Sequence, residues 1–254
     1  MKISIITITY NRAHLIGQTI QSVLDQTHGY FEHIIVDDGS DDNTENVVSA
    51  FNDNRLRYFR HEHCANLSRL HNFGIRKANG EIIAILDSDD LWKSDKLEKT
   101  AALFENPEVD FMTHNISYFS DLDRVKKPYY KHRIDFHKNL LTEVLQFKIL
   151  PFPVILFRRN ILTKMPYLNE NFVDGQQDFL IRVASKYKIY FMAESLTYMR
   201  LHEKNIHKKN VIPYFSNYYK TTTNLFLTKK ISTVEYLNGI FLNSKNLAKH
   251  LITN

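Results

Sequence analysis

Short apolar runs that stop at polar or acidic residues mark the first hundred positions of the chain. Residues 2–9, 32–36 and 82–86 are such runs, and the second and third are followed directly by Asp37 and Asp87. Runs of this length rich in β-branched residues predict strands, and the unbroken apolar character of residues 82–86 predicts a strand buried on both faces. The pattern therefore predicts three core strands, two of which end in carboxylates.

A helix is predicted between the first two strands. Its apolar positions recur at helical spacing and are Leu15, Ile16, Ile20, Val23 and Leu24. A strand, a helix and a parallel strand form a right-handed crossover, which places the carboxyl ends of both strands at the same edge of the sheet. Because ligands of open α/β sheets bind at that edge, polar turns that are far apart in sequence should meet there.

Two acidic turns follow the second and third strands. Residues 37–42 read DDGSDD, and residues 87–90 read DSDD. Three carboxylates in four positions repel one another unless a cation lies among them, and hard oxygen ligands select Mg²⁺ or Mn²⁺. Asp and Ser are also common in turns and at helix starts, so the alternative is a turn before a helix capped by Ser94 or Asp95. Two such turns at one edge favour a metal site.

Four blocks of the chain, taken with their order and spacing, resemble the family 2 glycosyltransferases of the A-type (GT-A) fold. The blocks are residues 5–12 (IITITYNR), 22–27 (SVLDQT), 35–44 (IVDDGSDDNT) and 72–92, and the last contains the family's Asp-x-Asp signature at residues 87–89. The resemblance implies a single α/β, Rossmann-like nucleotide-diphospho-sugar transferase fold with a mostly parallel central sheet.

The resemblance also divides the chain. It is close over residues 1–105, loose over residues 150–207 and absent further on. We therefore predict a glycosyltransferase domain over residues 1–210, with a nucleotide-sugar-binding half at 1–105 and an acceptor half at 106–210. Residues 211–254, where apolar positions recur at helical spacing, are predicted to form a helical C-terminal extension.

What the resemblance implies is an enzyme that transfers a sugar from a nucleotide diphosphate to an acceptor hydroxyl, with inversion at the anomeric carbon. The departing nucleotide diphosphate is highly charged, so a divalent cation would stabilise the charge that develops as the glycosidic bond breaks. The family's metal site maps onto Asp87, Asp89 and His202. The ion is expected to be Mn²⁺ or Mg²⁺.

The same resemblance implies a set of contacts to the nucleotide sugar. Tyr10 either stacks on the base or packs at the strand end, and Arg12 either contacts phosphate or is solvated. His71 stands where the family usually has an Arg, which leaves Arg69 as the nearest substitute for a phosphate contact. The implied contacts are Thr7, Thr9, Tyr10, Arg12, Asp38, Arg69, His71, Asp87, Ser88 and Arg200.

An inverting transfer needs a general base near the acceptor hydroxyl. By the family's spacing to the Arg that Arg182 resembles, the base would fall on Gln176, which cannot take a proton. We therefore predict Asp178 as the base, with Asp174 as the second candidate. For both residues the alternative is helix capping, since an Asp in the first turn of a helix also favours its dipole.

Composition bears on location and partners. The net charge is +5, from 33 Lys and Arg against 28 Asp and Glu, and basic residues gather with aromatic ones at residues 126–133 and 208–230. Either these stretches contact the inner face of the cytoplasmic membrane peripherally, or they are solvated basic faces. Nucleic acid is not an expected partner, because no recognised binding motif accompanies the charge. The single Cys64 and the lack of a spanning or signal-like stretch predict a cytoplasmic location.

Two other functions are alternatives to sugar transfer. A sugar-nucleotide pyrophosphorylase would need a Gly-rich phosphate loop near the first strand, and residues 9–13 do not form one. A protein that binds a nucleotide sugar without transferring it is the remaining alternative. The expected partners are a nucleotide-sugar donor, UDP-linked by family habit, and a saccharide or lipid-linked saccharide acceptor in capsule, O-antigen or exopolysaccharide synthesis. The oligomeric state is open, with a homodimer as one alternative.

Overall fold

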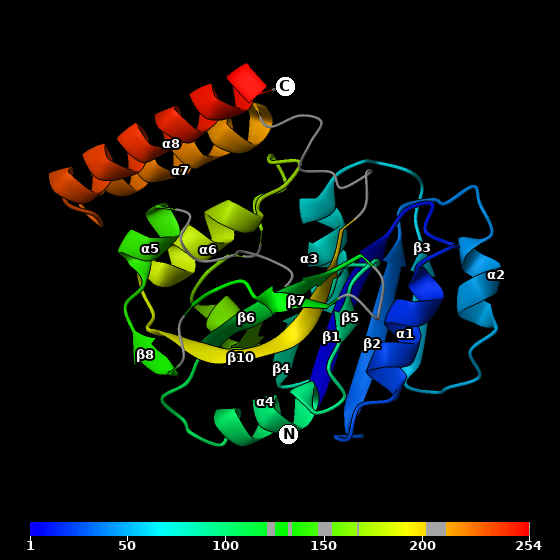
Figure 1. The fold of residues 1–254 in the computed structure, drawn as a ribbon. Helices are drawn as coiled ribbons and strands as arrows, with labels where there is room; N and C mark the ends of the chain where they lie inside the picture. Colours follow the sequence, from blue (N-terminus) through cyan, green and yellow to red (C-terminus); the bar gives the residue numbers. More distant parts are fainter. Residues whose placement is uncertain (121–124, 132–133, 147–153, 167, 202–211, 254) are drawn as a thin grey trace.

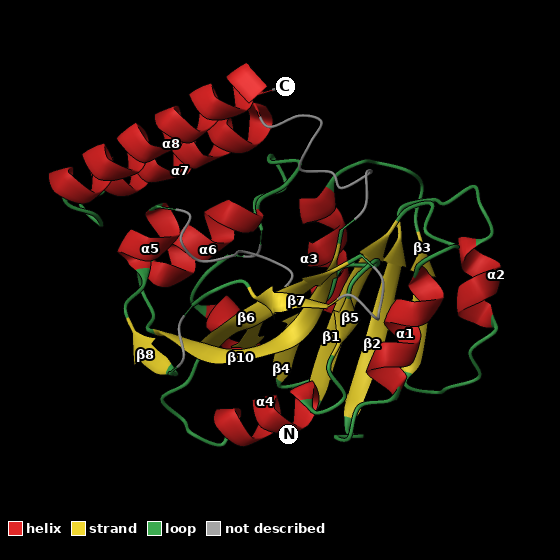
Figure 2. Ribbon diagram, in the orientation of Figure 1, coloured by secondary structure: helices red, strands yellow, loops and turns green. Residues whose placement is uncertain are grey.

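A single mixed sheet of ten strands forms the centre of the molecule (Figures 1 and 2). The computed structural model describes residues 1–120, 125–131, 134–146, 154–166, 168–201 and 212–253. The main path of the sheet runs β3-β2-β1-β4-β9-β6-β10-β5, with β7 beside β6 and β8 beside β10.

The three predicted strands lie in the parallel half of this sheet, together with a fourth, β3, that the sequence analysis did not predict. β1 pairs in parallel with both β2 and β4, and β3 pairs in parallel with β2. Thr9 lies opposite Asp37, which in turn lies opposite Arg60, so three strands end at one level. These strands are β1 (Ile3–Thr9), β2 (Phe31–Asp37), β3 (Leu56–Arg60) and β4 (Ile82–Ile85).

The second half of the sheet mixes directions. β9 runs antiparallel between β4 and β6, whereas β10 is parallel to β6 and therefore points the same way as β1. On the main path β9 and β5 are thus reversed, and the prediction of a mostly parallel α/β sheet is confirmed. The strands are β5 (Leu91–Trp92), β6 (Phe111–Phe119), β7 (Val125–Pro128), β8 (Phe136–Lys138), β9 (Ile155–Arg158) and β10 (Ile189–Arg200).

Helices cover both faces of the sheet, as Figure 2 shows. Along β1, Ile6 belongs to the core cluster that includes residues of α3, α5 and α6, whereas Ile3 and Ile5 point to the other face and belong to the cluster that includes residues of α1 and α4. Both faces of β1 are therefore buried, although Ser4, Thr7 and Thr9 interrupt its apolar positions. The helices are α1 (Ile16–Leu24), α2 (Thr44–Ser49), α3 (Leu67–Lys77), α4 (Lys96–Phe104), α5 (Leu141–Leu145) and α6 (Gln176–Ala184), with a 3-10 helix at Arg159–Thr163.

A buried carboxylate fixes the amino end of β2. Glu32 accepts hydrogen bonds from the Ser4 hydroxyl, the Asn79 amide and the Arg57 guanidinium. Burial by itself would raise the pKa of Glu32, but these hydrogen bonds lower it to about 2. The network joins β1, β2 and β3 to the turn before β4 at the edge opposite the acidic turns.

Two helices follow the sheet as a C-terminal hairpin, α7 (Ile212–Leu227) and α8 (Thr233–Thr253). α7 packs against α6, and α8 packs against α7 and α5 (Figure 1). Ser232 and Glu235 form a capping box at the start of α8: each backbone amide donates to the other's side chain. The predicted helices of the C-terminal extension are therefore present. Among the described residues, no helix has both the length and the apolar character that crossing a bilayer requires.

Candidate active site

Three carboxylates converge where β4 ends. Asp87, Asp89 and Asp90 each offer an oxygen, and the three oxygens lie within 4.8 Å of one another. The buried strand Ile82–Ile85 delivers this turn to the carboxyl edge, as the apolar run predicted. Within the described residues, Oδ2 of Asp90 is buried without a hydrogen-bond partner. A buried carboxylate oxygen of that kind suits a cation ligand, so the residues present fit the predicted divalent metal.

Burial and neighbouring negative charges raise the pKa values of the carboxyl groups in this turn. Burial, reinforced by the charges of Asp89 and Asp174, raises the pKa of Asp87 to about 7, and Arg12 opposes this shift. Burial, together with the charges of Asp87 and Asp89, also raises the pKa of Asp90 well above its usual value. These shifts show that several negative charges converge on a site with little solvent, which is what a bound cation would relieve.

Two arginines border the acidic turn. Nε of Arg12 lies 4.0 Å from Oδ2 of Asp89, and Nε of Arg200 donates to the Asp89 carbonyl at 2.9 Å. The Arg200 amide also donates to Oδ1 of Asp90 at 2.9 Å, and its guanidinium lies over the ring of Phe119. Both predicted phosphate contacts thus lie beside the carboxylates, Arg12 in the loop after β1 and Arg200 at the end of β10.

A lysine lies buried on the other side of Asp90. Lys96 is fully buried at the start of α4, where Nζ donates to the Thr197 hydroxyl at 3.0 Å and lies 3.9 Å from the centre of the Trp92 ring. Burial holds the pKa of Lys96 well below its usual value, and the charge of Asp90 opposes this shift. The sequence did not single out this residue, because a Lys at a helix start usually points to solvent.

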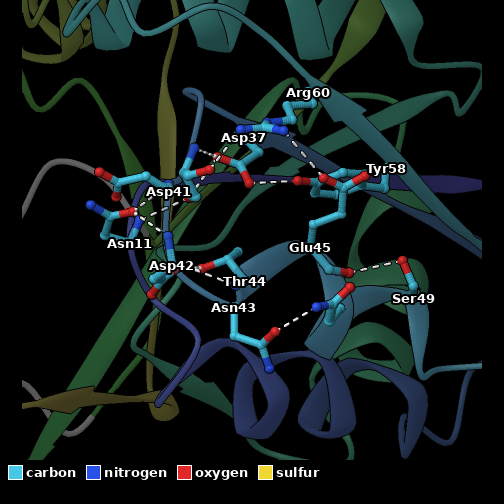
Figure 3. A network of polar contacts seen from close by, with 12 residues as sticks. Asn11, Asp37, Asp41, Asp42, Asn43, Thr44, Glu45, Ser49, Tyr58 and Arg60 are labelled. Atoms are coloured by element: carbon cyan, nitrogen blue, oxygen red, sulfur yellow. Dashed lines mark hydrogen bonds and ion pairs between the residues drawn. The ribbon is translucent and has the colours of Figure 1, made fainter.

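The acidic turn after β2 is built differently, as Figure 3 shows. Asp37 accepts hydrogen bonds from the amide and hydroxyl of Ser40 and from the hydroxyl of Tyr58. Asn11, in the left-handed region at φ 52°, accepts from the Asp41 amide and so ties the end of β1 to this turn. These carboxylates and amides hold one another, so this turn shapes the edge of the sheet rather than a second metal site.

Asp38 and Tyr10 form a separate corner of the edge. The Asp38 carboxylate accepts from the amides of Cys64 and Ala65 and lies 2.9 Å from Nδ1 of His63. The His63 ring in turn stacks on the half-exposed Tyr10 ring with a centroid distance of 4.2 Å. This corner offers an aromatic face beside a carboxylate, and His63 is a member that the sequence analysis missed because its contact with Tyr10 is non-local.

Gly39 lets the loop after β3 approach this corner. Its φ of +77° lies in the left-handed region, and a Cβ there would lie 2.8 Å from the His63 backbone nitrogen. Glycine is required on both counts.

The other predicted donor contacts lie at different depths. Thr7 is fully buried inside the sheet, where its hydroxyl hydrogen-bonds Nε2 of His33, and Thr9 lies buried at the strand end. Ser88 is buried within the acidic turn. Arg69 is exposed on the first turn of α3. His71 faces inward with Nδ1 2.8 Å from the Leu67 carbonyl, and burial lowers the pKa of His71 to about 4, so it carries no positive charge at neutral pH. The predicted metal ligand His202 lies outside the described residues.

The two candidate bases differ in their surroundings. Asp178 is buried in α6, where its carboxylate accepts from Nε of Arg182 at 2.9 Å and from the Thr221 hydroxyl at 2.7 Å. Asp174 is half-buried in the loop before α6, and its charge contributes to the raised pKa of Asp87. Asp174 is therefore the candidate whose charge reaches the acidic turn.

The Asp174 loop is anchored on the carboxyl edge. The Gly175 amide donates to the Ser68 hydroxyl at 2.7 Å, and the Ser68 amide donates to the Val173 carbonyl at 3.3 Å. Ser68 belongs to the first turn of α3, so the loop is attached to the half of the molecule that carries Asp38. The structure thereby brings residues that are far apart in the sequence, from Thr9 to Arg200, to the carboxyl edge of the sheet.

Solved structures share this fold along nearly the whole chain. S. aureus TarS 1-349 in complex with UDP-GlcNAc matches with a TM-score of 0.76 at 19% identity, over 98% of this chain and 72% of that chain. The mannosyltransferase PcManGT from Pyrobaculum calidifontis, in complex with GDP-Man and Mn²⁺, matches with a TM-score of 0.70 at 17% identity, over 98% of this chain and 73% of that chain. The fold is that of the GT-A glycosyltransferases.

The family model described as "Glycosyl transferase family 2" matches residues 4–165, and the chain belongs to this family. The uncharacterized glycosyltransferase alr2836 of Nostoc sp. is 30% identical over 217 residues, which are 82% of this chain and 67% of the relative. The UDP-Glc:alpha-D-GlcNAc-diphosphoundecaprenol beta-1,3-glucosyltransferase WfgD of Escherichia coli is 34% identical over 138 residues, 54% of each protein. The chain thus spans between half and two thirds of the length of these relatives. The predicted family and fold are confirmed.

Proposed function

We propose that the protein is an inverting glycosyltransferase that moves a sugar from a UDP-sugar to an acceptor hydroxyl. The observation that carries the proposal is the convergence of Asp87, Asp89 and Asp90 at the carboxyl edge, next to Arg12 and Arg200. A nucleotide diphosphate presents two phosphates to such a site. Carboxylates that share a divalent ion, together with guanidinium groups, match that charge.

The metal site in this proposal consists of Asp87 and Asp89, with Asp90 as a third carboxylate and His202 as the further predicted ligand. A bound Mn²⁺ or Mg²⁺ would supply positive charge to the diphosphate oxygens as the nucleotide leaves. Arg12 and Arg200 add donors from the protein itself. The Asp38 and Tyr10 corner is proposed to hold the base: the Tyr10 ring would stack on it, and Asp38, whose carboxylate accepts the Cys64 and Ala65 amides, holds the loop that lines this corner.

For the proton transfer we propose Asp174 rather than Asp178. A base needs an oxygen that reaches the acceptor hydroxyl, and both oxygens of Asp178 already accept hydrogen bonds from Arg182 and Thr221. Asp174 lies in a loop at the edge, and its charge acts on Asp87. In the proposed step Asp174 takes the proton of the acceptor hydroxyl as the hydroxyl oxygen attacks the anomeric carbon and the bond to the nucleotide diphosphate breaks.

The acceptor proposed is a saccharide on a lipid diphosphate, as used in envelope polysaccharide synthesis. The support is the relative WfgD, which is named as a glucosyltransferase acting on a diphosphoundecaprenol-linked sugar. Such an acceptor resides in a membrane, so we also propose that the protein works at the cytoplasmic face of the membrane without spanning it. In this proposal residues 1–105 bind the nucleotide sugar and residues 106–210 bind the acceptor.

Transfer assays with a donor panel test the proposal. The protein, with Mn²⁺, is incubated with UDP-, GDP- and dTDP-sugars and a short-chain lipid diphosphate carrying N-acetylglucosamine, and products are identified by mass. We expect a product one sugar heavier with a UDP-sugar, and none with Asp89→Asn. Binding of nucleotide sugars without any product or nucleotide release would instead favour the non-transferring binding protein.

A further inference from the structure

The positive charge of the chain is concentrated in its C-terminal part. Residues 211–254 contain five lysines and one acidic residue, Glu235, so this stretch carries a formal charge of +4, whereas the whole chain carries +5. The remaining 210 residues are therefore nearly neutral at +1. The lysines are Lys220, Lys229, Lys230, Lys245 and Lys249.

The same hairpin exposes large apolar side chains. Val234, Leu237 and Phe241 of α8 are 67%, 58% and 70% exposed, and Leu227 at the end of α7 is 72% exposed. Positions 234, 237 and 241 lie on one face of a helix, and we call these three residues the apolar stripe. Lys245, also exposed, continues this face one turn further on.

α8 already packs on the hairpin through its opposite face. A Cβ at Gly239 would lie 2.5 Å from the Tyr218 hydroxyl, so α8 approaches α7 closely there, and Asn243 is fully buried. The acid of this stretch is engaged as well, because Glu235 accepts hydrogen bonds from the amide and hydroxyl of Ser232. The outer face of α8 thus presents apolar and basic groups together. Figure 1 shows the hairpin on the outside of α5 and α6, away from β1, β2 and β3.

We propose that this hairpin docks the protein on the surface of an anionic phospholipid bilayer. An amphipathic helix with an apolar face and neighbouring lysines lies in the interface of such a bilayer, where the apolar side chains enter the acyl boundary and the lysines meet the headgroups. A second copy of the chain is the less suitable occupant. Packing two apolar stripes together would bring two hairpins of +4 into contact, with one glutamate each to offset the repulsion.

The hairpin is also attached to the acceptor side of the active site. The Thr221 hydroxyl donates to Asp178 at 2.7 Å, and the Asn217 side chain donates to the Asp174 carbonyl at 3.5 Å. A bilayer that holds α8 therefore lies on the part of the molecule that carries the proposed base. This consequence rests on the proposed function, whereas bilayer docking itself does not.

Vesicle flotation of the full chain tests the docking. Vesicles of phosphatidylcholine with about a third phosphatidylglycerol are compared with phosphatidylcholine alone, at low and high salt. We expect binding to the anionic vesicles, weakened by salt and by neutral lipid. Leu237→Ser with Phe241→Ser should weaken it at least about tenfold, because two apolar side chains no longer enter the interface. Lys229→Gln with Lys230→Gln should weaken it roughly twentyfold to thirtyfold at low salt.

Tyr30→Ser is the matched control, since Tyr30 is 61% exposed and lies far from the hairpin in the sequence. This variant should bind vesicles as the unchanged chain does. Absence of binding to anionic vesicles at low salt would overturn the docking, and so would binding that the Leu237→Ser, Phe241→Ser variant retains in full. A dimer in light scattering that this variant converts to a monomer would assign the stripe to a second copy instead.

Failure of docking is distinguishable from failure of the proposed function. Flotation requires neither donor nor acceptor, and UDP binding by calorimetry requires no lipid. A hairpin variant that loses vesicle binding should keep its UDP affinity within about twofold. Loss of both in that variant would mean that the hairpin is needed for folding, and circular dichroism and thermal unfolding of the same sample would show it.

Discussion

Comparing Asp174→Asn with Asp178→Asn should show which carboxylate takes part in catalysis and which one stabilises the fold. Both changes replace a carboxylate by an amide of the same shape. Asp178 is buried and accepts from a charged guanidinium at 2.9 Å and from a hydroxyl at 2.7 Å, whereas Asp174 is half-buried and its carboxylate accepts from the Gln176 amide at 3.1 Å. The two variants are therefore each other's control.

The expected magnitudes follow from these contacts. A hydrogen bond to a charged group contributes about 1.5–3 kcal/mol, so Asp178→Asn should lower the free energy of unfolding by about 2 kcal/mol. For a domain of this size that corresponds to a drop in Tm of about 4–8 °C. The amide oxygen of Asp174→Asn still accepts from Gln176, and its stability should change by less than about 1 kcal/mol. Turnover should instead fall about 10²–10⁴-fold, as expected when a general base is removed.

The assay is transfer under saturating donor and acceptor at a temperature where both variants are folded, alongside thermal unfolding by circular dichroism. Asp174→Asn should be folded and nearly inactive, with unchanged UDP affinity, and Asp178→Asn should be active but less stable. If Asp178→Asn abolished turnover while folded and Asp174→Asn did not, the assignment of the base would be refuted.

Three further outcomes test the rest of the account. Glu32→Gln should lower the free energy of unfolding by about 3 kcal/mol at pH 7: a carboxyl whose folded pKa is about 2 stabilises the fold above its unfolded pKa near 4.5, so the difference from the unchanged chain should fade in urea titrations as the pH falls to 2. Gly39→Ala, at φ +77° and facing the His63 backbone, should lower the free energy of unfolding by more than about 1 kcal/mol and weaken UDP binding. A UDP affinity equal to that of the unchanged chain in calorimetry would count against the proposal that the Asp38 and Tyr10 corner holds the nucleobase. Lys96→Met should leave the buried Thr197 hydroxyl without the hydrogen bond from Nζ and cost about 1–3 kcal/mol in thermal unfolding, and an unchanged Tm would contradict that role.

Local patterns sufficed for the part of the site that one strand and its turn define. The apolar run that ends at Asp87 predicts both the buried strand and the position of the carboxylates, because neighbouring residues determine where the strand is buried and where it ends. Strands β1 and β2 followed in the same way, whereas β3 was not predicted. The reversed strand β9 did not, since its place between β4 and β6 depends on pairings far along the chain.

Non-local contacts decided the residues that the sequence left open or missed. Lys96 is buried because Thr197, 101 positions further on, accepts its ammonium. In the sequence, Asp178 and Asp174 are both acids near a helix start and cannot be told apart. The structure distinguishes them, because the Thr221 hydroxyl of α7 donates a hydrogen bond to Asp178. His63 joins the Tyr10 corner across the sheet edge. No periodic pattern in the sequence predicts any of these contacts.

The central claim is that the acidic turn after β4 binds a metal ion together with a nucleotide diphosphate. Calorimetric titration of UDP, with Mn²⁺ and then with excess chelator, tests it most directly in the unchanged chain and in Asp89→Asn. The account predicts binding with Mn²⁺ that is lost with chelator and lost in Asp89→Asn, whose thermal unfolding remains cooperative. UDP binding of equal affinity with Mn²⁺, with chelator and in Asp89→Asn would contradict it.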